Sequence, residues 1–255
     1  EIDNNFNQHA YGTFRYGPLL LNSGRSRSTM GLGSHGKLLL GKELPSLDLF
    51  CFSLKFGKYF KFYNYMMPLN NIYGNILKET DLPKYLLAHR VSFDAFPNLR
   101  IAISELMIIN SYLKWNYLNP LNVYHNISNA NQVNIISSFD IEYIPYRNVR
   151  SFISVAIDEI DNYVIEIPPD TPRESRLEMG IQTGIKILDP IGLNNSAIQF
   201  EYLNTDRWLY NYDETKDLTA TFVEKIEFPD KHDFYRFIGH YLGSNTEAFF
   251  LDFDY

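Results

Sequence analysis

Hydrophobic and polar side chains alternate along several short stretches of this sequence. Between Val133 and Tyr143, positions 133, 135, 139, 141 and 143 are apolar, positions 134, 138, 140 and 142 are polar, and Ile136 and Ser137 are the only exceptions. Residues 177–187 and 249–255 repeat the pattern. A period of two residues is typical of β-strands with one apolar and one polar face, so it predicts a strand-rich fold.

Shorter alternating segments at 50–56, 91–95, 153–157 and 198–202 are bounded by proline- and asparagine-bearing breaks. Residues 93–104 and 139–157 are therefore predicted to form hairpins with short connections, which makes consecutive strands antiparallel neighbours. Helical signals are weak. One short helix is predicted within residues 73–90 and another within residues 119–132, where Asn119 precedes Pro120 as a cap and first turn.

Two all-β architectures fit this periodicity, a soluble sandwich and an outer-membrane barrel. The polar face mixes small polar and charged residues, which mildly favours a barrel lumen. Aromatic residues gather near the strand ends, where a bilayer places its aromatic girdles, although tyrosines at sandwich edges are the alternative. These residues are Tyr59, Tyr63, Tyr65, Tyr112, Trp115, Tyr117, Tyr143 and Tyr146. The pattern alone leaves both architectures open.

Composition narrows the class of protein. Aromatic residues make up 16% of the 255 residues, which favours half-buried strands, and the absence of repeats or composition shifts predicts one domain over 1–255. A net charge of -7 and a pI near 5.4 disfavour a nucleic-acid partner. Cys51 is the only cysteine, so no disulfide forms within the chain. No run approaches the ~20 apolar residues of a membrane helix, and the first residues lack a signal-peptide pattern.

Three segments, in matching order, resemble the capsule assembly Wzi family of outer-membrane proteins. The first is "YGPLLLNSGRSRSTMGLGSHGKLLLGKELPSLDLF". The second joins "HRVSFDAFPNLRIAISELMII" to "LNPLNVYHNISNANQVNIISSFDIEYIP", and the third comprises "EYLNTDRWLY" and "FIGHYLGSNTEAFFLDF". The motif positions that carry the resemblance are Gly24, His89, Arg90, Asn119, Pro120, His125, Gln132, Gly239, His240 and Gly243.

The resemblance implies an all-β fold, a monomeric transmembrane antiparallel β-barrel. The chain length predicts roughly 12–16 strands for it, and the weak helical signals predict one or two short helices in loops or lumen. The resemblance also implies residence in the outer membrane of a diderm bacterium, contact with outer-membrane lipid and a lectin-like, non-enzymatic role in holding surface polysaccharide, with no cofactor. The chain lacks the family's N-terminal helical bundle and later strands, and Tyr241 replaces a proline. It is therefore expected to be a shortened member or a fragment.

Two groups of residues are candidates for polysaccharide binding. Arg25 and Arg27 lie in a glycine-bearing stretch, and a guanidinium is a bidentate donor to the carboxylates of acidic sugars. The alternative is that they pair with lumen carboxylates. Tyr112, Trp115 and Tyr117 offer flat apolar rings that stack on sugars. Their alternative role is to anchor the barrel at the membrane interface.

Other candidate sites are weaker. Asp140 and Glu142 share a strand face about 7 Å apart, which suits an inverting glycosidase but also ordinary lumen lining. The six histidines lack metal-ligand spacing, and "GLGSHGK" at 31–37 lacks the spacing of a phosphate-binding loop. No metal and no enzymatic activity are expected. The rival functions are a porin-like outer-membrane channel and a secreted β-rich polysaccharide-binding protein or glycosidase.

Overall fold

The strands of this protein follow one another as antiparallel neighbours. The computed structural model describes residues 9–69, 82–127, 133–160, 177–207, 209–210, 222–226 and 234–255. Within them the strands are β1 (Ala10–Tyr16), β2 (Leu19–Ser26), β3 (Leu47–Phe56), β4 (Phe60–Leu69), β5 (Lys84–Phe96), β6 (Leu99–Asn110), β7 (Val133–Tyr146), β8 (Val149–Ile160), β9 (Leu177–Leu188), β10 (Ala197–Thr205), β11 (Val223–Ile226), β12 (Phe234–Phe237) and β13 (Thr246–Asp254).

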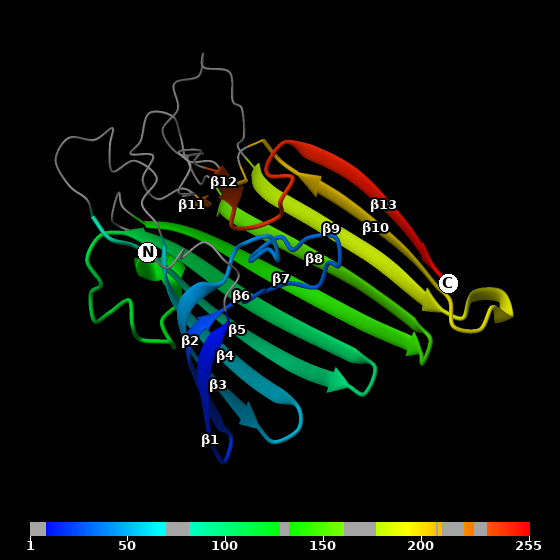
Figure 1. Ribbon diagram of the computed structural model, residues 1–255, viewed down its shortest axis with the longest axis horizontal. Helices are drawn as coiled ribbons and strands as arrows, with labels where there is room; N and C mark the ends of the chain where they lie inside the picture. The colour runs from blue at the N-terminus through cyan, green and yellow to red at the C-terminus, as the bar shows by residue number, and fades with distance from the viewer. Residues whose placement is uncertain are drawn as a thin grey trace.

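Eleven of the described strands form one curved sheet in the order β1-β2-β3-β4-β5-β6-β7-β8-β9-β10-β13, and β11 and β12 form a separate hairpin (Figure 1). All eleven are joined by antiparallel pairs, among them β5 with β6 and β7 with β8. The hairpins predicted at 93–104 and 139–157 are thereby confirmed. In the described residues β1 and β13 lie at the two edges and do not pair, so the sheet is open and the predicted closure into a barrel is not observed.

The two ends of the sheet differ in their connections. Short turns join β1 to β2, β3 to β4, β5 to β6 and β7 to β8 at one end, the short-turn end. The connections at the opposite, long-loop end are longer and include residues 27–46, 111–132 and 206–245. The 3₁₀ helix η2 (Pro190–Gly192) lies in the connection between β9 and β10.

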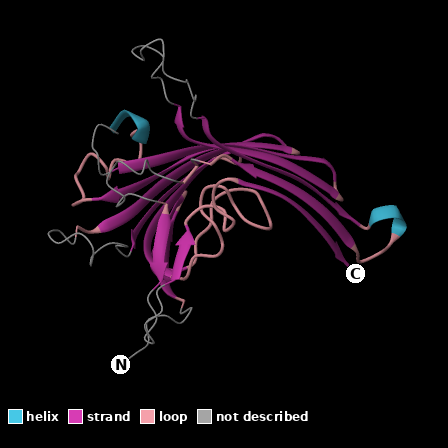
Figure 2. Cartoon of the chain, turned by 90° about the horizontal axis from the view of Figure 1, so that it is seen from above, coloured by secondary structure: helices cyan, strands magenta, loops and turns pink. Residues whose placement is uncertain are grey.

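Alternate residues of each strand point to opposite faces of the sheet, and Figure 2 shows that one face is convex and the other concave. Large apolar side chains on the convex face are solvent-accessible, with exposed fractions from 39% for Ile153 to 72% for Leu251. The others include Phe50, Phe93, Ile103, Phe139, Ile185, Phe200, Phe249 and Phe253. The alternation predicted from the sequence therefore separates an exposed apolar face from a face rich in polar residues.

The concave face is covered near the long-loop end by two chain segments. We call residues 27–46, together with the described residues between 209 and 245, the inner plug, which appears as pink loops within the curve of the sheet in Figure 2. Its Leu38, Leu40 and Ile238 pack with Leu106 and Ile136 of the sheet in one buried cluster. Part of the concave face is thus an apolar core rather than a polar lining.

A separate segment, residues 111–127, folds over the convex face. We call it the outer segment. It contains the 3₁₀ helix η1 (Tyr124–Ile127). Its Tyr117 and Tyr124 are buried against Met107 and Ile135, and the same cluster includes Leu87, Ile109 and Val133. The exceptions at Ile136 and Ser137 now have an explanation, because Ile136 faces the inner plug and Ser137 faces this segment.

The helix predictions had mixed outcomes. The helix within 119–132 corresponds to η1, which is shorter than expected and starts later, at Tyr124. The helix predicted within 73–90, before a strand at Arg90, is wrong for Lys84–His89, because β5 starts at Lys84; Arg90 lies in a strand as predicted, and residues 70–81 lie outside the described residues. Among the described residues, no helix has the length and apolar character needed to cross a membrane.

Candidate functional site

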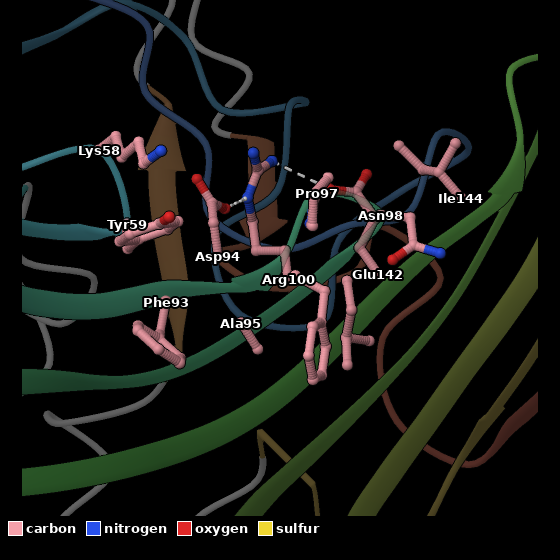
Figure 3. Close-up of a pocket in the computed structure, with 12 residues that line it drawn as sticks. Lys58, Tyr59, Phe93, Asp94, Ala95, Pro97, Asn98, Arg100, Glu142 and Ile144 are labelled. Atoms are coloured by element: carbon pink, nitrogen blue, oxygen red, sulfur yellow. Dashed lines mark hydrogen bonds and ion pairs between the residues drawn. The ribbon is translucent and has the colours of Figure 1, made fainter.

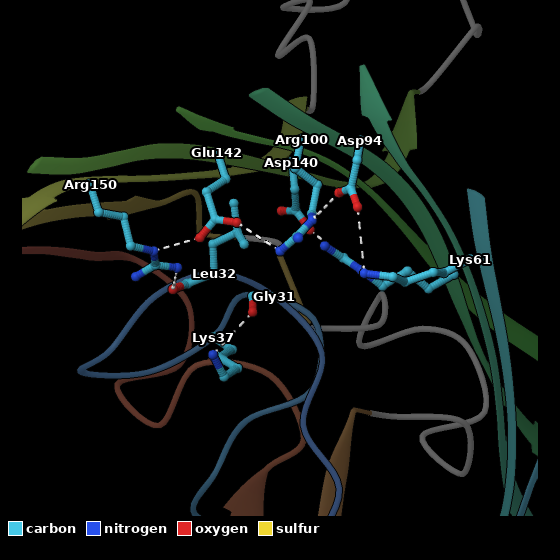
Figure 4. A network of polar contacts seen from close by, with 10 residues as sticks. Gly31, Leu32, Lys37, Lys61, Asp94, Arg100, Asp140, Glu142 and Arg150 are labelled. Carbon is cyan, nitrogen blue, oxygen red and sulfur yellow. Dashed lines mark hydrogen bonds and ion pairs between the residues drawn. The ribbon is translucent and has the colours of Figure 1, made fainter. Parts of the chain in front are cut away.

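A chain of ion pairs crosses the concave face between β4 and β8 (Figure 4). Arg100 donates from Nε to Asp94 Oδ1 at 2.6 Å and from Nη1 to Glu142 Oε2 at 3.0 Å. Arg150 Nε donates to the other Glu142 oxygen at 2.5 Å, and Lys61 Nζ lies 3.5 Å from Asp94 Oδ2. Alternating charges on neighbouring strands therefore neutralise one another across the face.

Asp140 is the most deeply buried carboxylate of this network. It accepts a hydrogen bond from Arg90, which also donates to Ser104 Oγ at 2.9 Å. Both carboxylates that the sequence raised as a glycosidase pair, Asp140 and Glu142, are thus engaged by guanidinium groups. In this state each carboxylate serves as an acceptor in a structural network.

A pocket of about 530 Å³ opens beside this network at the short-turn end (Figure 3). Its wall combines Asp94, Arg100 and Glu142 with Lys58 and Asn98. The aromatic residues Tyr59, Phe93 and Phe96 also line it, together with Ala95, Pro97, Leu99 and Ile144. The volume lies within the range of small-ligand sites. Aromatic faces beside hydrogen-bonding groups are chemically suited to a sugar ring.

The glycine-rich stretch at residues 31–37 binds an anion supplied by the protein itself. Ser34 N donates to Glu201 Oε1 at 2.7 Å, and His35 N donates to Glu201 Oε2 at 3.3 Å. Gln182 Nε2 reaches both Glu201 Oε2 and Gly36 O. Residues 31–37 thus use backbone N–H groups as a phosphate loop does, but their acceptor is the buried Glu201 carboxylate of β10.

Lys37 and His35 also fix the inner plug. Lys37 Nζ donates to the carbonyl oxygens of Gly31 and Gly33, at 3.0 and 2.9 Å. Burial and, secondarily, the charge of Arg150 lower the Lys37 pKa. His35 pairs with Asp252 at 2.5 Å and stacks on Phe250 with ring centroids 4.5 Å apart. The plug is therefore tied to both β10 and the edge strand β13.

The second half of the inner plug is organised around Tyr210 and His240. Tyr210 Oη donates to Leu38 O at 2.5 Å and accepts from His240 N at 3.2 Å. Burial raises the Tyr210 pKa. Burial, with the nearby charges of His35 and Lys42, lowers the pKa of His240 to about 4. His240 is therefore neutral at physiological pH.

A third polar cluster lies on the convex face under the outer segment. Glu105 of β6 pairs with His89 Nε2 and with His125 Nδ1, both at 3.0 Å, and accepts from Tyr124 N at 2.8 Å. Ser137 Oγ lies 3.4 Å from both Glu105 Oε1 and His125 Nδ1. Two of the motif histidines, 36 residues apart in sequence, thus meet on one carboxylate that the sequence analysis did not single out. The signal for Glu105 is a charge at a position where the alternation requires an apolar side chain.

Ser137, His125 and Glu105 do not form a hydrolytic triad. Both Ser137 Oγ and Glu105 Oε1 approach the same imidazole nitrogen, His125 Nδ1. A relay requires the nucleophile and the carboxylate to bind opposite ring nitrogens. Within the described part of the chain, no group of three or more histidine, cysteine or acidic residues is placed to hold a metal ion. The cluster therefore joins the outer segment to the sheet.

The two groups of predicted sugar-binding residues lie apart. Arg25 is the penultimate residue of β2, with its Nε 3.7 Å from Asp48 Oδ1, too far for a hydrogen bond, and Arg27 is exposed just beyond the strand. Tyr112 and Trp115 are exposed on the outer segment, whereas Tyr117 is buried. Four strand-to-strand steps, roughly 19 Å, separate β2 from β6. The structure therefore does not bring these groups into one site.

The remaining motif positions have structural contacts of different kinds. Gly24 has φ +130°, and a Cβ there would lie 2.3 Å from Ala10 O, so glycine allows β1 to approach β2. Asn119 Oδ1 accepts from Leu121 N and so caps the turn that contains Pro120. Gly239, His240 and Gly243 lie in the inner plug, Arg90 lies in the concave network, and Gln132 lies outside the described residues.

Comparisons with known proteins support the fold. No protein-family model and no curated protein sequence matches this chain. Among solved structures, the chain is similar to Wzi, an outer-membrane protein involved in group 1 capsule assembly in Escherichia coli and described as a carbohydrate-binding β-barrel. The TM-score is 0.61 and the sequence identity is 13%.

The chain resembles Wzi in fold over almost its whole length. The match covers 96% of this chain, but only 52% of the Wzi chain, so this sequence spans about half the length of the structure it matches. At this identity the comparison shows a shared fold, and it does not show membership of the family. The functional consequences are proposals.

Proposed function

We propose that this chain forms part of the wall of an outer-membrane β-barrel. The barrel binds exported surface polysaccharide without catalysing a reaction on it. The observation that carries this proposal is the convex face, where exposed Ile, Leu and Phe side chains occur on β3, on every strand from β5 to β10 and on β13. A soluble protein rarely exposes a continuous apolar surface of this extent. A lipid-facing barrel wall requires one.

The aromatic residues at the short-turn end support the same proposal. Exposed rings lie in or beside the turns of four hairpins and at the end of β13, and a bilayer would place an aromatic girdle at such a level. They are Tyr16, Phe56, Tyr59, Phe96, Tyr146 and Tyr255. The fold shared with Wzi adds support from a protein described as an outer-membrane carbohydrate binder.

Cell fractionation of the full-length protein tests the membrane part of the proposal. The protein should be extracted from outer membranes only with detergent, and Ile153→Arg should reduce the assembled amount, because a lipid-facing arginine near the midplane costs about 2–4 kcal/mol. Ile191→Arg is the matched control, since Ile191 is fully exposed in the turn between β9 and β10. Recovery of unaltered protein in the detergent-free soluble fraction, with no effect of Ile153→Arg, would contradict the proposal.

We place acidic polysaccharide at Arg25 and Arg27, which lie at the long-loop end. Purified protein in detergent should bind a uronic-acid-containing capsular polysaccharide, and the double variant Arg25→Ala/Arg27→Ala should weaken binding several-fold at low salt. Arg147→Ala, at an exposed turn of the short-turn end, should leave binding unchanged. If Lys58→Ala in the pocket abolishes binding instead, the pocket is the sugar site and the arginine assignment is wrong.

The inner plug argues against the rival role of a wide channel. Its leucines form an apolar cluster with the concave face, and its loops contact Arg150, Gln182, Glu201 and Asp252. Planar-bilayer recordings should therefore show no steady current. A stable, voltage-independent conductance would favour the porin-like function.

A further inference from the structure

We propose that the outer segment, residues 111–127, is a membrane-interface anchor whose exposed side chains lie at the boundary between lipid headgroups and acyl chains. The inference rests on the proposed barrel and deepens it, because it assigns Tyr112 and Trp115 to lipid rather than to sugar. Its partner is a bilayer surface.

The first argument is the face on which the segment lies. It packs on Leu87, Met107 and Ile135, which share the convex face of the sheet with the exposed Ile103 and Phe139. The apolar surface therefore continues from the strands onto the segment.

The second argument is the chemistry of the segment's own outer surface. Trp115 is 89% exposed, Leu121 is 82% exposed and Tyr112 is 71% exposed, and Leu118 and Val123 are also exposed. Lys114 lies next to Trp115 and is exposed, with its Nζ 5.8 Å from the Tyr117 ring centroid. Tryptophan, tyrosine and lysine beside leucine are the composition of a lipid interface, where rings sit at headgroup level and cations meet phosphate.

The third argument is the level of the outer segment along the barrel wall, counted from the short-turn end. A spanning strand needs roughly 9–11 residues. Counted along β6 from Leu99 at the short-turn end, that length reaches the level of Met107 and Ile109, and the outer segment covers both. The uncovered convex residues of β6, Leu99, Ile101 and Ile103, are too few to span a hydrocarbon layer. The far boundary of that layer therefore falls on the segment.

The fourth argument is that the segment's backbone is suited to this depth. Irregular backbone is not tolerated in hydrocarbon unless its polar groups are satisfied. Here successive turns bond Tyr117 N to Lys114 O and Leu118 N to Trp115 O. Asn122 Nδ2 donates to Asn116 O, and Asn119 Oδ1 accepts from Leu121 N.

Glu105 explains how the segment is held in this position. A carboxylate facing lipid would be unfavourable, yet Glu105 lies on the convex face between the levels of Ile103 and Met107. His89, His125 and Tyr124 N satisfy it, and the segment covers it. The convex face thus presents lipid with the apolar surface of the segment instead of a charge.

Depth-dependent fluorescence quenching tests the proposal. The chain has two tryptophans, so Trp208→Phe leaves Trp115 as the only one, and the difference between wild type and Trp115→Phe provides the same signal if Trp208→Phe fails to fold. The proteins are reconstituted in phosphatidylcholine vesicles brominated at shallow or deep acyl positions. Trp115 should be quenched several-fold more by shallow than by deep bromines, and only weakly by aqueous iodide.

A reporter tryptophan on the convex face separates failure of this inference from failure of the proposed barrel. Phe200→Trp, in a background of Trp115→Phe and Trp208→Phe, places a tryptophan on the convex face of β10. If this reporter is quenched by brominated lipid while Trp115 is quenched only by iodide, the anchor is wrong and the barrel stands. If neither is quenched by lipid, both fail. Protection of Trp115 from iodide by added polysaccharide, without lipid quenching, would assign the segment to sugar and overturn the anchor.

Discussion

Glu105 is the residue on which the position of the outer segment depends most directly. Its carboxylate is nearly buried and accepts contacts from two histidines and one backbone N–H. A buried carboxylate that satisfies several donors cannot be removed without leaving them unpaired. His240 is the opposite case. It is buried and neutral, so adding a proton to its ring is unfavourable.

We expect Glu105→Ala to destabilise the folded protein by about 2–4 kcal/mol, because His89, His125 and Tyr124 N lose their common acceptor. Urea unfolding of the protein in detergent measures the effect, and faster proteolysis within residues 111–127 should accompany it. Glu247→Ala is the control: Glu247 accepts one hydrogen bond from Tyr202 at the exposed surface, at 3.0 Å, so the change should be small. Equal effects of the two substitutions would refute the structural role of Glu105.

The pKa of His240 predicts a specific pH dependence of stability. The pKa falls from 6.5 to about 4 on folding, so between these values the unfolded chain binds a proton that the folded chain does not. Stability is therefore complete above pH 6.5 and decreases as the pH falls towards 4, by at most about 3 kcal/mol. The groups facing His240 from other parts of the chain are His35, Lys42, the Tyr210 hydroxyl, the Phe250 ring and the Gly36 backbone.

His240→Asn isolates this contribution, because an asparagine oxygen can replace Nδ1 as the acceptor of Leu242 N. The variant should be less stable than wild type at pH 7.5, and the difference should shrink as the pH falls to 4.5. Unfolding free energies at both pH values test this. A difference that stays constant with pH would show that His240 does not remain neutral in the folded protein.

At the scale of elements, the inner plug depends on close packing against buried rings. A Cβ at Gly239 would lie 2.4 Å from Tyr210 Cε1, and a Cβ at Gly36 would lie 2.3 Å from His240 Nε2. Tyr210 Oη also accepts from His240 N and donates to Leu38 O. The plug therefore has little space in which to adjust.

Gly239→Ala should destabilise the protein by about 1–3 kcal/mol through overpacking and should expose residues 27–46 to protease. Thermal unfolding followed by circular dichroism, with mapping of the first cleavage sites, provides the measurement. Gly12→Ala in β1 is the control, since a Cβ there meets nothing within 4 Å. If Gly239→Ala behaves like Gly12→Ala, the plug is loosely packed.

Strands β3, β5 to β10 and β13 could be predicted from the sequence, but β1, β2, β4, β11, β12 and the segments that cover the sheet could not. Alternation in 133–143 and 249–255 specifies β7 and β13 because each side chain has only two faces to choose between. The inner plug carries no period, since its leucines at 38–40 pack through loop geometry that long-range contacts determine. The meeting of His89 with His125 likewise depends on Glu105 and on the path of residues 111–127, which no local pattern specifies.

For the whole molecule, the described residues form an open sheet whose edges are β1 and β13, with a fold similar to that of Wzi. The account requires that the convex face meets hydrocarbon while the concave face does not. Adjacent residues on one strand provide matched reporters, because Phe52 and Ile185 point outward whereas Ser53 and Lys186 point inward.

The most direct measurement is the accessibility of spin labels in vesicles. Cys51→Ala removes the single native cysteine, and Phe52→Cys, Ser53→Cys, Ile185→Cys and Lys186→Cys each add one labelling site. Labels at positions 52 and 185 should collide frequently with lipid-soluble oxygen and rarely with a water-soluble nickel chelate, and labels at 53 and 186 should show neither strong oxygen access nor contact with lipid. Frequent collision of the labels at 52 and 185 with the nickel chelate, with no more oxygen access than at 53 and 186, would contradict a lipid-facing convex surface.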